Sequence, residues 1–264
     1  MPVDGRVQAL IAAAEALRDE LRPWVGRRGG TVEHVLHPLD YAWELHRAYL
    51  ETWARPGVEA VFVGMNPGPW GMCQTGVPFG SPDLVRELLG LSGRVRPPAR
   101  THPDRPVHGL DCPRNEVSGQ RLWGAVRDCF GGAAPFFRRF FVLNYCPLAF
   151  QSATGANVTP DKVGAALLGD ALERCDRHLA RALRALGPRT VIGVGAWATV
   201  RARRVVEAEG IEARVGTILH PSPASPAANR GWLEVVRGQL AALGHPWPAP
   251  AKVEAPVASR RRRG

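Results

Sequence analysis

Gly-Met-Asn-Pro-Gly-Pro-Trp-Gly-Met (residues 64–72) directly follows the apolar run 58–63 and leads into Gln-Thr-Gly-Val-Pro-Phe-Gly (74–80). A β-branched run that ends in glycine and proline predicts a buried strand feeding a tight loop, and ligands of open α/β sheets bind at such loops. The loop carries one polar side chain without charge, Asn66, and Pro67 and Pro69 fix their own φ angles. A rigid, nearly uncharged loop is a poor phosphate cradle and is suited to holding a flat ring.

Three further strands are predicted, at residues 139–144, 190–195 and 213–219. Helical patterns lie between and before them, at residues 4–22, 83–91, 118–130 and, with a break, 159–184. Asn144 ends the second strand and His220 follows the fourth, just as Asn66 follows the first. Because the carboxyl ends of parallel strands share one edge of the sheet, the three polar side chains are expected to converge there.

The length and composition fit one α/β domain with short terminal extensions: the chain has 264 residues and is 45% hydrophobic. We expect an N-terminal helix and loop at 1–30, the main domain at 31–244, and a disordered tail rich in Pro, Ala and Arg at 245–264. The apolar pattern 7–17 is interrupted by charge and predicts an amphipathic helix, neither a signal peptide nor a membrane span. The expected protein is therefore a soluble, cytoplasmic monomer without a membrane partner.

The formal net charge of +10 favours a polyanionic partner. The tail holds five cationic side chains and one acidic side chain, so it contributes +4 and leaves +6 on the rest of the chain. The tail is either a solubilising end or a nonspecific DNA-binding segment. Residues 93–113 lack periodicity and predict a long loop that is either a solvated surface or a contact for nucleic-acid phosphates. The arginines in and next to this loop are Arg94, Arg96, Arg100, Arg105 and Arg114.

The sequence offers only weak signs of a metal or cofactor, and we expect none. The five cysteines form no C-x-x-C pair, which argues against both a disulfide framework and a thiolate metal site. His34, His37 and His46 surround a helix entry at Pro38, which favours incidental histidines over a metal triad.

Residues 193–198, Gly-Val-Gly-Ala-Trp-Ala, match the dinucleotide fingerprint G-x-G-x-x-A. The match lies late in the chain and lacks the carboxylate expected about 20 residues further on. Close packing of a strand on a helix is the favoured interpretation of Gly193 and Gly195, with a cofactor role second.

Several motifs resemble the single-strand-selective monofunctional uracil-DNA glycosylase family. They occur in one order between residues 32 and 243, at 64–72, 74–80, 102–107, 116–119, 144–148 and 220–223. The resemblance implies a three-layer α/β/α sandwich with a short central four-stranded parallel sheet.

The same resemblance implies a role for each matching residue. Asn66 would position the attacking water, His220 would face the leaving base, and Asn144 would read the uracil edge. Phe79 would stack on the base, and the backbone around Met65 and Gly68 would line the pocket. The residues expected to contact DNA are Asn157, Ser222, Pro223, Ala224 and Arg230. Asn157 precedes a predicted helix start, with Thr159 as cap, where it either contacts a phosphate or belongs to a plain loop.

The expected activity is excision of uracil from single- and double-stranded DNA after base flipping, leaving an abasic site. Gly68 leaves space at the pyrimidine 5-position, so 5-hydroxymethyluracil is an expected substrate. Lys162 and Lys252, the only lysines, lie outside the motifs, which disfavours a Schiff-base lyase activity.

Ala224 departs from the family, because vertebrate members have a wedging arginine at this position. A methyl group cannot fill the space that a flipped base vacates, so we expect weaker retention of duplex uracil unless Arg230 or another loop substitutes. Two other functions stay open: a nonenzymatic basic DNA-binding domain, and a nucleotide-binding oxidoreductase that uses Gly193 and Gly195.

Overall fold

The computed structural model describes residues 4–251, which are built around a four-stranded parallel sheet in the order β3-β2-β6-β7. The strands are β2 (Ala60–Gly64), β3 (Phe140–Asn144), β6 (Thr190–Val194) and β7 (Arg214–Ile218). Every residue of β2 and β6 is buried, as expected for parallel strands covered on both faces. The four strands predicted from the sequence are confirmed.

The register brings the carboxyl ends of the strands level with one another. Gly64 pairs with Asn144 across β2 and β3, and Val194 pairs with Ile218 across β6 and β7. Polar residues at or just beyond these ends therefore meet at one edge of the sheet.

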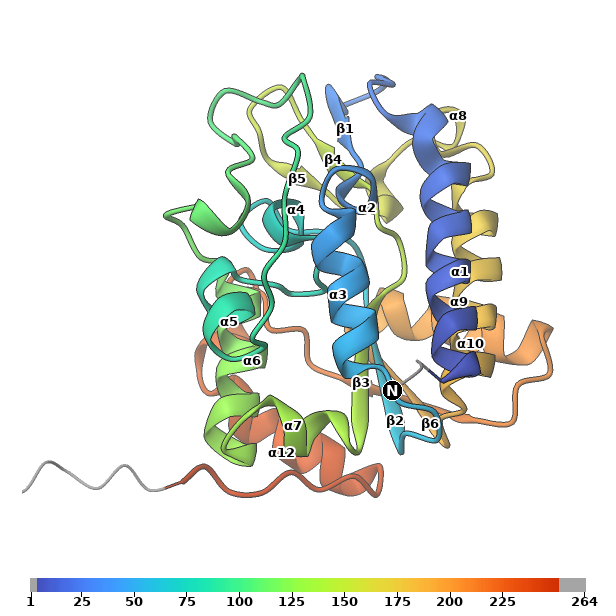
Figure 1. Ribbon diagram of the computed structural model, residues 1–264, viewed down its shortest axis with the longest axis vertical. Coiled ribbons are helices and arrows are strands. Elements are labelled where there is room, and N and C mark those ends of the chain that lie inside the picture. Colours follow the sequence, from blue (N-terminus) through green and yellow to red (C-terminus); the bar gives the residue numbers. More distant parts are fainter. Residues whose placement is uncertain (1–3, 252–264) are drawn as a thin grey trace, which may run out of the picture.

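Helices cover both faces of the sheet, which gives the three-layer α/β/α sandwich expected from the sequence (Figure 1). On one side lie α9 (Ala171–Leu186) and α10 (Ala196–Ala208), with α1 (Gly5–Leu21) packed against α9. On the other side lie α6 (Val117–Phe130), α7 (Ala133–Phe137) and α12 (Trp232–Ala242). None of the helices among residues 4–251 is long and apolar enough to cross a membrane.

Helix α3 (Trp43–Trp53) covers the edge strand β3. The Tyr49 hydroxyl donates to the Val142 carbonyl at 2.9 Å, and the Tyr49 ring stacks on Phe141 with centroids 5.1 Å apart. An outward-facing carbonyl of the edge strand is thus paired instead of exposed.

Short elements connect the layers. They are η1 (Arg22–Trp24), β1 (His34–Leu36), α2 (Pro38–Tyr41), α4 (Met72–Thr75), α5 (Pro82–Glu87), η2 (Gly109–Asp111), β4 (Ala149–Gln151), β5 (Asn157–Val158), η3 (Pro160–Lys162), α8 (Ala165–Leu168) and α11 (Pro226–Asn229). The strands β1, β4 and β5 form a small antiparallel sheet that was not predicted from the sequence.

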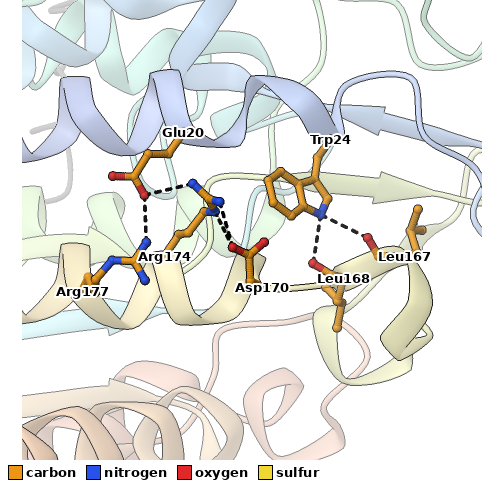
Figure 2. Close-up of polar contacts among 7 residues, drawn as sticks. All are labelled: Glu20, Trp24, Leu167, Leu168, Asp170, Arg174 and Arg177. Atoms are coloured by element: carbon orange, nitrogen blue, oxygen red, sulfur yellow. Dashed lines mark hydrogen bonds and ion pairs between the residues drawn. The ribbon is translucent and has the colours of Figure 1, made fainter.

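The N-terminal helix is part of the main domain, because η1 and α1 dock on α8 and α9 through a closed polar network (Figure 2). The Trp24 indole N–H donates to the carbonyls of Leu167 and Leu168, at 3.1 and 2.9 Å. Arg174 forms ion pairs with Asp170 at 2.8 Å and with Glu20 at 3.4 Å. Arg177 also reaches Glu20, at 3.1 Å, so each charged group in this network has an opposite charge beside it.

The predicted helix from 159 to 184 is divided into η3, α8 and α9. Gly169 has φ +50° between the last two, a conformation that ends α8. The Thr159 side chain makes no capping hydrogen bond, and the helix it precedes has only three residues. The prediction of Thr159 as the cap of a long helix is therefore wrong.

The expected tail begins too early at His245. His245 and Trp247 are buried, and Trp247 packs edge-on against Phe130 and Phe136, with centroids 5.4 and 5.8 Å apart. An aromatic side chain among prolines can bury enough apolar surface to hold an extended segment in place. The segment 245–251 thus belongs to the folded domain, and the remainder of the expected tail, 252–264, lies outside the described residues.

Candidate active site

The carboxyl edge of the sheet holds a cavity of about 360 Å³. Asn66 follows β2, Asn144 ends β3 and His220 follows β7, and all three line this cavity. The remaining residues that line it are Met65, Gly68, Pro69, Met72, Phe79, Glu116, Ser118, Asn157, Thr159, Ser222 and Pro223. The cavity thus gathers residues from the ends of β2, β3 and β7 and from several connecting segments between residues 65 and 223.

Gly64 makes room for two of the cavity's functional groups. A Cβ at this position would lie 2.2 Å from Asn144 Oδ1 and 2.7 Å from the Phe79 ring. Glycine ends β2 because an amide and an aromatic ring both pack against its Cα.

Asn144 presents an unused acceptor to the cavity. Its Nδ2 donates to Met72 Sδ at 3.1 Å, whereas its buried Oδ1 has no partner within residues 4–251. A buried oxygen without a hydrogen bond is costly unless a ligand or water supplies one.

Phe79 has a strained backbone, with φ +54°, and is the only non-glycine residue with positive φ in the part of the chain that the structure describes. The structure around it holds this conformation. A Cβ on Gly119 would lie 2.2 Å from the Phe79 carbonyl oxygen, and the Trp123 indole N–H donates to the Pro78 carbonyl at 3.2 Å. Strain of this kind persists where the surroundings fix it and is common at functional sites.

Asn66 stands on a loop that is tied down at several points. Gln74 Nε2 donates to the carbonyls of Pro69 and Pro106, at 2.9 and 3.0 Å. The Asn66 side chain itself is free of the protein: its buried Nδ2 has no partner among residues 4–251. The loop is therefore rigid while its amide is available to a ligand.

Glu116 is a cavity residue to which the sequence assigned no role. Its Oε2 accepts a hydrogen bond from the Trp70 backbone N–H at 2.9 Å, and burial raises the pKa of its carboxyl group. A Cβ on Gly68 would lie 2.5 Å from this oxygen. The missing side chain at Gly68 thus admits the carboxylate that fixes the loop, a reason that the sequence alone did not reveal.

His220 is neutral and its tautomer is fixed. Its Nδ1 accepts a hydrogen bond from the Ser222 backbone N–H at 3.1 Å, so the proton of the neutral ring resides on Nε2. Burial lowers the pKa of His220 to about 4. At neutral pH the ring therefore offers one N–H donor, and it lies beside Phe79 with ring centroids 6.0 Å apart.

The loop after His220 is anchored to α6. Arg121 donates to the carbonyls of Pro221 and Ser222, at 3.1 and 3.2 Å, and to Asn229 Oδ1 at 2.8 Å. Ser222 and Pro223 line the cavity, whereas Ala224 and Arg230 are exposed and lie outside its lining.

Asn157 lines the cavity from a short strand, whereas the sequence predicted a loop before a helix. It belongs to the short strand β5 and not to a loop before a helix, and η3 behind it has only three residues. A phosphate contact at a helix N-terminus is therefore not available to explain Asn157.

The glycines of the dinucleotide-like motif serve packing. A Cβ on Gly193 would lie 2.4 Å from the Thr199 backbone nitrogen in α10, and a Cβ on Gly195 would lie 3.3 Å from His220 Cβ. The favoured interpretation of close strand-to-helix packing is confirmed for Gly193, and Gly195 makes room for His220.

Two of the three histidines near Pro38 have backbone partners, and the third, His34, lies edge-on to the His102 ring with centroids 5.7 Å apart. His37 Nε2 and His46 Nδ1 donate to the carbonyls of Arg18 and Gly76, at 2.9 and 2.8 Å. Within residues 4–251, no group of three or more His, Cys, Asp or Glu side chains is arranged to hold a metal ion.

Comparison with known proteins gives one consistent result. The model of the uracil DNA glycosylase superfamily matches residues 52–237. The single-strand selective monofunctional uracil DNA glycosylase of Bos taurus is 46% identical over 228 residues, which cover 86% of this chain and 83% of the bovine protein. The corresponding protein of Rattus norvegicus is 48% identical over 210 residues, which cover 80% of this chain and 76% of the rat protein.

A solved structure supports the fold. The crystal structure of wild-type Pedobacter heparinus SMUG2 superposes with a TM-score of 0.62 at 17% sequence identity, covering 89% of this chain and 97% of that chain.

Proposed function

This chain belongs to the family of single-strand-selective monofunctional uracil-DNA glycosylases, and we propose that the cavity at the carboxyl edge of its sheet is where uracil is cut from DNA. The protein is thus a DNA repair enzyme that hydrolyses an N-glycosidic bond. The roles of individual residues below are part of the proposal. A base inside a duplex cannot reach a cavity of this kind, so the target nucleotide must turn out of the stack.

One observation carries the proposal: three polar groups with unused hydrogen-bonding capacity face one cavity beside an aromatic ring. They are the Asn66 amide, Asn144 Oδ1 and His220 Nε2–H, and the ring is that of Phe79. A planar molecule with both donors and acceptors on its edge satisfies this set.

Asn144 selects uracil. Its Oδ1 accepts from the ring N3–H of uracil, and the amide proton of Nδ2 that is not directed at Met72 donates to the 4-oxo group. Cytosine has an acceptor at N3 and a donor at position 4, so both contacts would become unpaired.

His220 stabilises the leaving base. As the glycosidic bond breaks, negative charge develops on uracil and positive charge on the sugar. Donation from Nε2–H to the 2-oxo group stabilises the departing anion, and a preorganised donor of this type contributes about 3–4 kcal/mol. The neutral ring is sufficient, in agreement with its low pKa.

Asn66 aims the water. An amide cannot deprotonate water strongly, but the anomeric carbon is already electrophilic when the bond to the base has largely broken. Orientation of the nucleophile is then the main requirement, and the bonds that fix the 64–72 loop supply it.

The substrate range and strand preference extend the proposal. Acceptance of 5-substituted uracils such as 5-hydroxymethyluracil is part of the proposal on the strength of the family resemblance, whereas the space beside the Gly68 Cα is occupied by the Glu116 carboxylate and does not supply room for the substituent. Ala224 is exposed and carries only a methyl group, so we propose that uracil in single strands is excised faster than uracil in duplexes. Replacement by arginine (Ala224→Arg) should then raise the duplex rate selectively.

The test is an excision assay in EDTA. Oligonucleotides that contain uracil, 5-hydroxymethyluracil or cytosine are incubated with the protein as single strands and as duplexes, and abasic sites are then cleaved with alkali. We expect cleavage at the two uracil bases and not at cytosine, with little strand breakage before alkali. Failure to excise uracil from either form of DNA would refute the proposal.

A further inference from the structure

Trp70 anchors a cluster of two arginines next to the cavity. The Arg114 guanidinium carbon lies 4.6 Å from the centroid of the Trp70 ring, and that of Arg105 lies 5.3 Å from it. Two cations on one indole repel each other, and a bound anion would offset this repulsion.

Neither guanidinium is neutralised by a carboxylate. Among residues 4–251, no Asp or Glu oxygen lies within ion-pairing distance of Arg105 or Arg114. Arg105 Nη1 donates to the Asp104 backbone carbonyl at 2.8 Å, and its buried Nε has no partner in the described part of the chain. The cluster thus holds positive charge and N–H donors in excess of what the surrounding residues use.

Stacking prepares these donors for an anion. A guanidinium that lies over an aromatic face keeps its in-plane N–H groups free, and its planar fork matches the oxygens of a phosphate. The ring also restricts the rotamers of both side chains, which lowers the entropy lost on binding.

The cluster adjoins the cavity on two sides. Pro69, which precedes Trp70, and Glu116, which binds the Trp70 N–H, both line the cavity. On the other side, Arg105 Cγ lies 3.1 Å from a Cβ built on Gly155, in the loop that leads to the cavity residue Asn157. A DNA strand with its base in the cavity would therefore pass close to both guanidinium groups.

We propose that Trp70, Arg105 and Arg114 form a phosphodiester clamp that holds the DNA strand beside the nucleotide in the cavity. This inference rests on the proposed function, because it takes the strand to enter where the uracil is bound. Arg105 and Arg114 contact phosphate oxygens, and Trp70 is a positioning residue that holds them. The clamp grips the backbone, so it acts on any sequence and contributes to substrate binding more than to bond cleavage.

The test measures binding of a uracil-free single strand as a function of salt. Each phosphate contact contributes about 0.7 to the slope of log K against log salt for single strands, so the double variant Arg105→Gln/Arg114→Gln should lower that slope by about 1.4. Arg138→Gln is the matched control. Arg138 is exposed and precedes β3, so it lies at the amino ends of the strands, whereas the cavity lies at their carboxyl ends. This variant should leave the slope at the wild-type value.

Excision kinetics separate a clamp from a general defect. In the double variant KM for a uracil-containing single strand should rise about tenfold or more, with kcat within about twofold of wild type. Trp70→Leu should weaken binding in the same direction, and Trp70→Phe should restore most of it. Because Arg114 is exposed, Arg114→Gln alone keeps the proposal testable if the double variant fails to fold; its expected slope change is about 0.7.

The clamp would be overturned if the double variant Arg105→Gln/Arg114→Gln had the same salt slope and the same KM as Arg138→Gln. The uracil-free strand makes this result independent of catalysis. If the wild-type protein excises no uracil but the variants still lower the salt slope as predicted, the proposed function is refuted. The clamp then stands as a DNA-binding site.

Discussion

Trp24 and Trp70 each carry two stacked arginines, but within the described part of the chain a carboxylate pairs with one of the arginines at Trp24 and with neither at Trp70. At Trp24 the stacked guanidiniums are those of Arg27 and Arg174. Arg174 is paired with Asp170 and Glu20, and Arg27 donates from Nε to the Pro23 carbonyl at 2.8 Å. At Trp70 neither arginine has an acidic partner among residues 4–251, and the neighbouring cavity contains amide atoms without hydrogen bonds.

The difference separates stability from function. A polar network that is closed within the protein lowers the free energy of the folded state and has nothing left to offer a ligand. Unused donors, unused acceptors and a strained Phe79 cost stability and are retained where a substrate completes them. Mutations at the Trp24 contact should therefore lower the free energy of unfolding, and mutations in the cavity should lower the rate of uracil excision.

The largest effect is expected from Trp24→Ala. This variant removes a buried indole and its bonds to Leu167 and Leu168, so the free energy of unfolding should fall by about 3–5 kcal/mol. Denaturant titration measures this loss. The excision rate per folded molecule should stay at the wild-type value, and a parallel loss of rate would break the proposed separation.

Asn66→Ala and His220→Ala should show the converse pattern. Each should reduce the single-turnover rate of uracil excision by about 10²–10³-fold, because each removes one preorganised group that acts in the transition state. Their unfolding transitions should change much less than that of Trp24→Ala, since the Asn66 amide nitrogen has no partner within residues 4–251 and His220 gives the fold only the bond from the Ser222 N–H to Nδ1. Undiminished excision by both variants would contradict the assigned roles.

Glu116 is partly buried and lines the cavity, and its carboxylate accepts a hydrogen bond from the loop that carries Asn66. Glu116→Ala should lower the excision rate about tenfold through loss of loop order. Glu116→Gln retains an oxygen acceptor for the Trp70 N–H and should recover most of the rate. Equal rates for the two variants would show that this hydrogen bond does not position Asn66.

The smallest effect is expected from pH. Because burial lowers the His220 pKa to about 4, the ring stays neutral and excision should vary less than about threefold between about pH 5 and about pH 8. A rate that titrates with a midpoint near the ordinary histidine pKa of about 6.5 would contradict a His220 ring that is neutral between about pH 5 and about pH 8.

Stability should nevertheless depend on pH in that range. The unfolded chain takes up protons below about pH 6.5, whereas folded His37, His46 and His220 do so only near pH 4. The stability contributed by the neutral rings is therefore complete above about pH 6.5 and is lost as the pH falls toward 4. Denaturant titrations at several pH values check the sign of this change.

The sequence predicted the sheet because β2, β3 and β6 are apolar runs that end at or beside glycine or a polar residue, and because β7 leads directly into the His-Pro motif at residue 220. The sequence also predicted that Asn66, Asn144 and His220 lie close together, because each is at the carboxyl end of a parallel strand and these ends share one edge of the sheet. The small sheet was missed because strands of two or three residues are too short to show a period of two. Trp247 was placed in a tail because its burial depends on phenylalanines more than 100 residues away, and Glu116 was overlooked because its partner Trp70 is 46 residues distant.

The central claim is that the unused polar atoms of the cavity are reserved for uracil, and NMR of the histidine rings and side-chain amides tests it most directly. At neutral pH, ¹⁵N-labelled His220 should have its proton on Nε2 and an unprotonated Nδ1. Addition of uracil should shift the His220 Nε2–H and the Asn144 amide, and the Trp24 indole N–H should not move. A proton on Nδ1, or uracil-induced shifts that spare His220 and Asn144, would contradict the account.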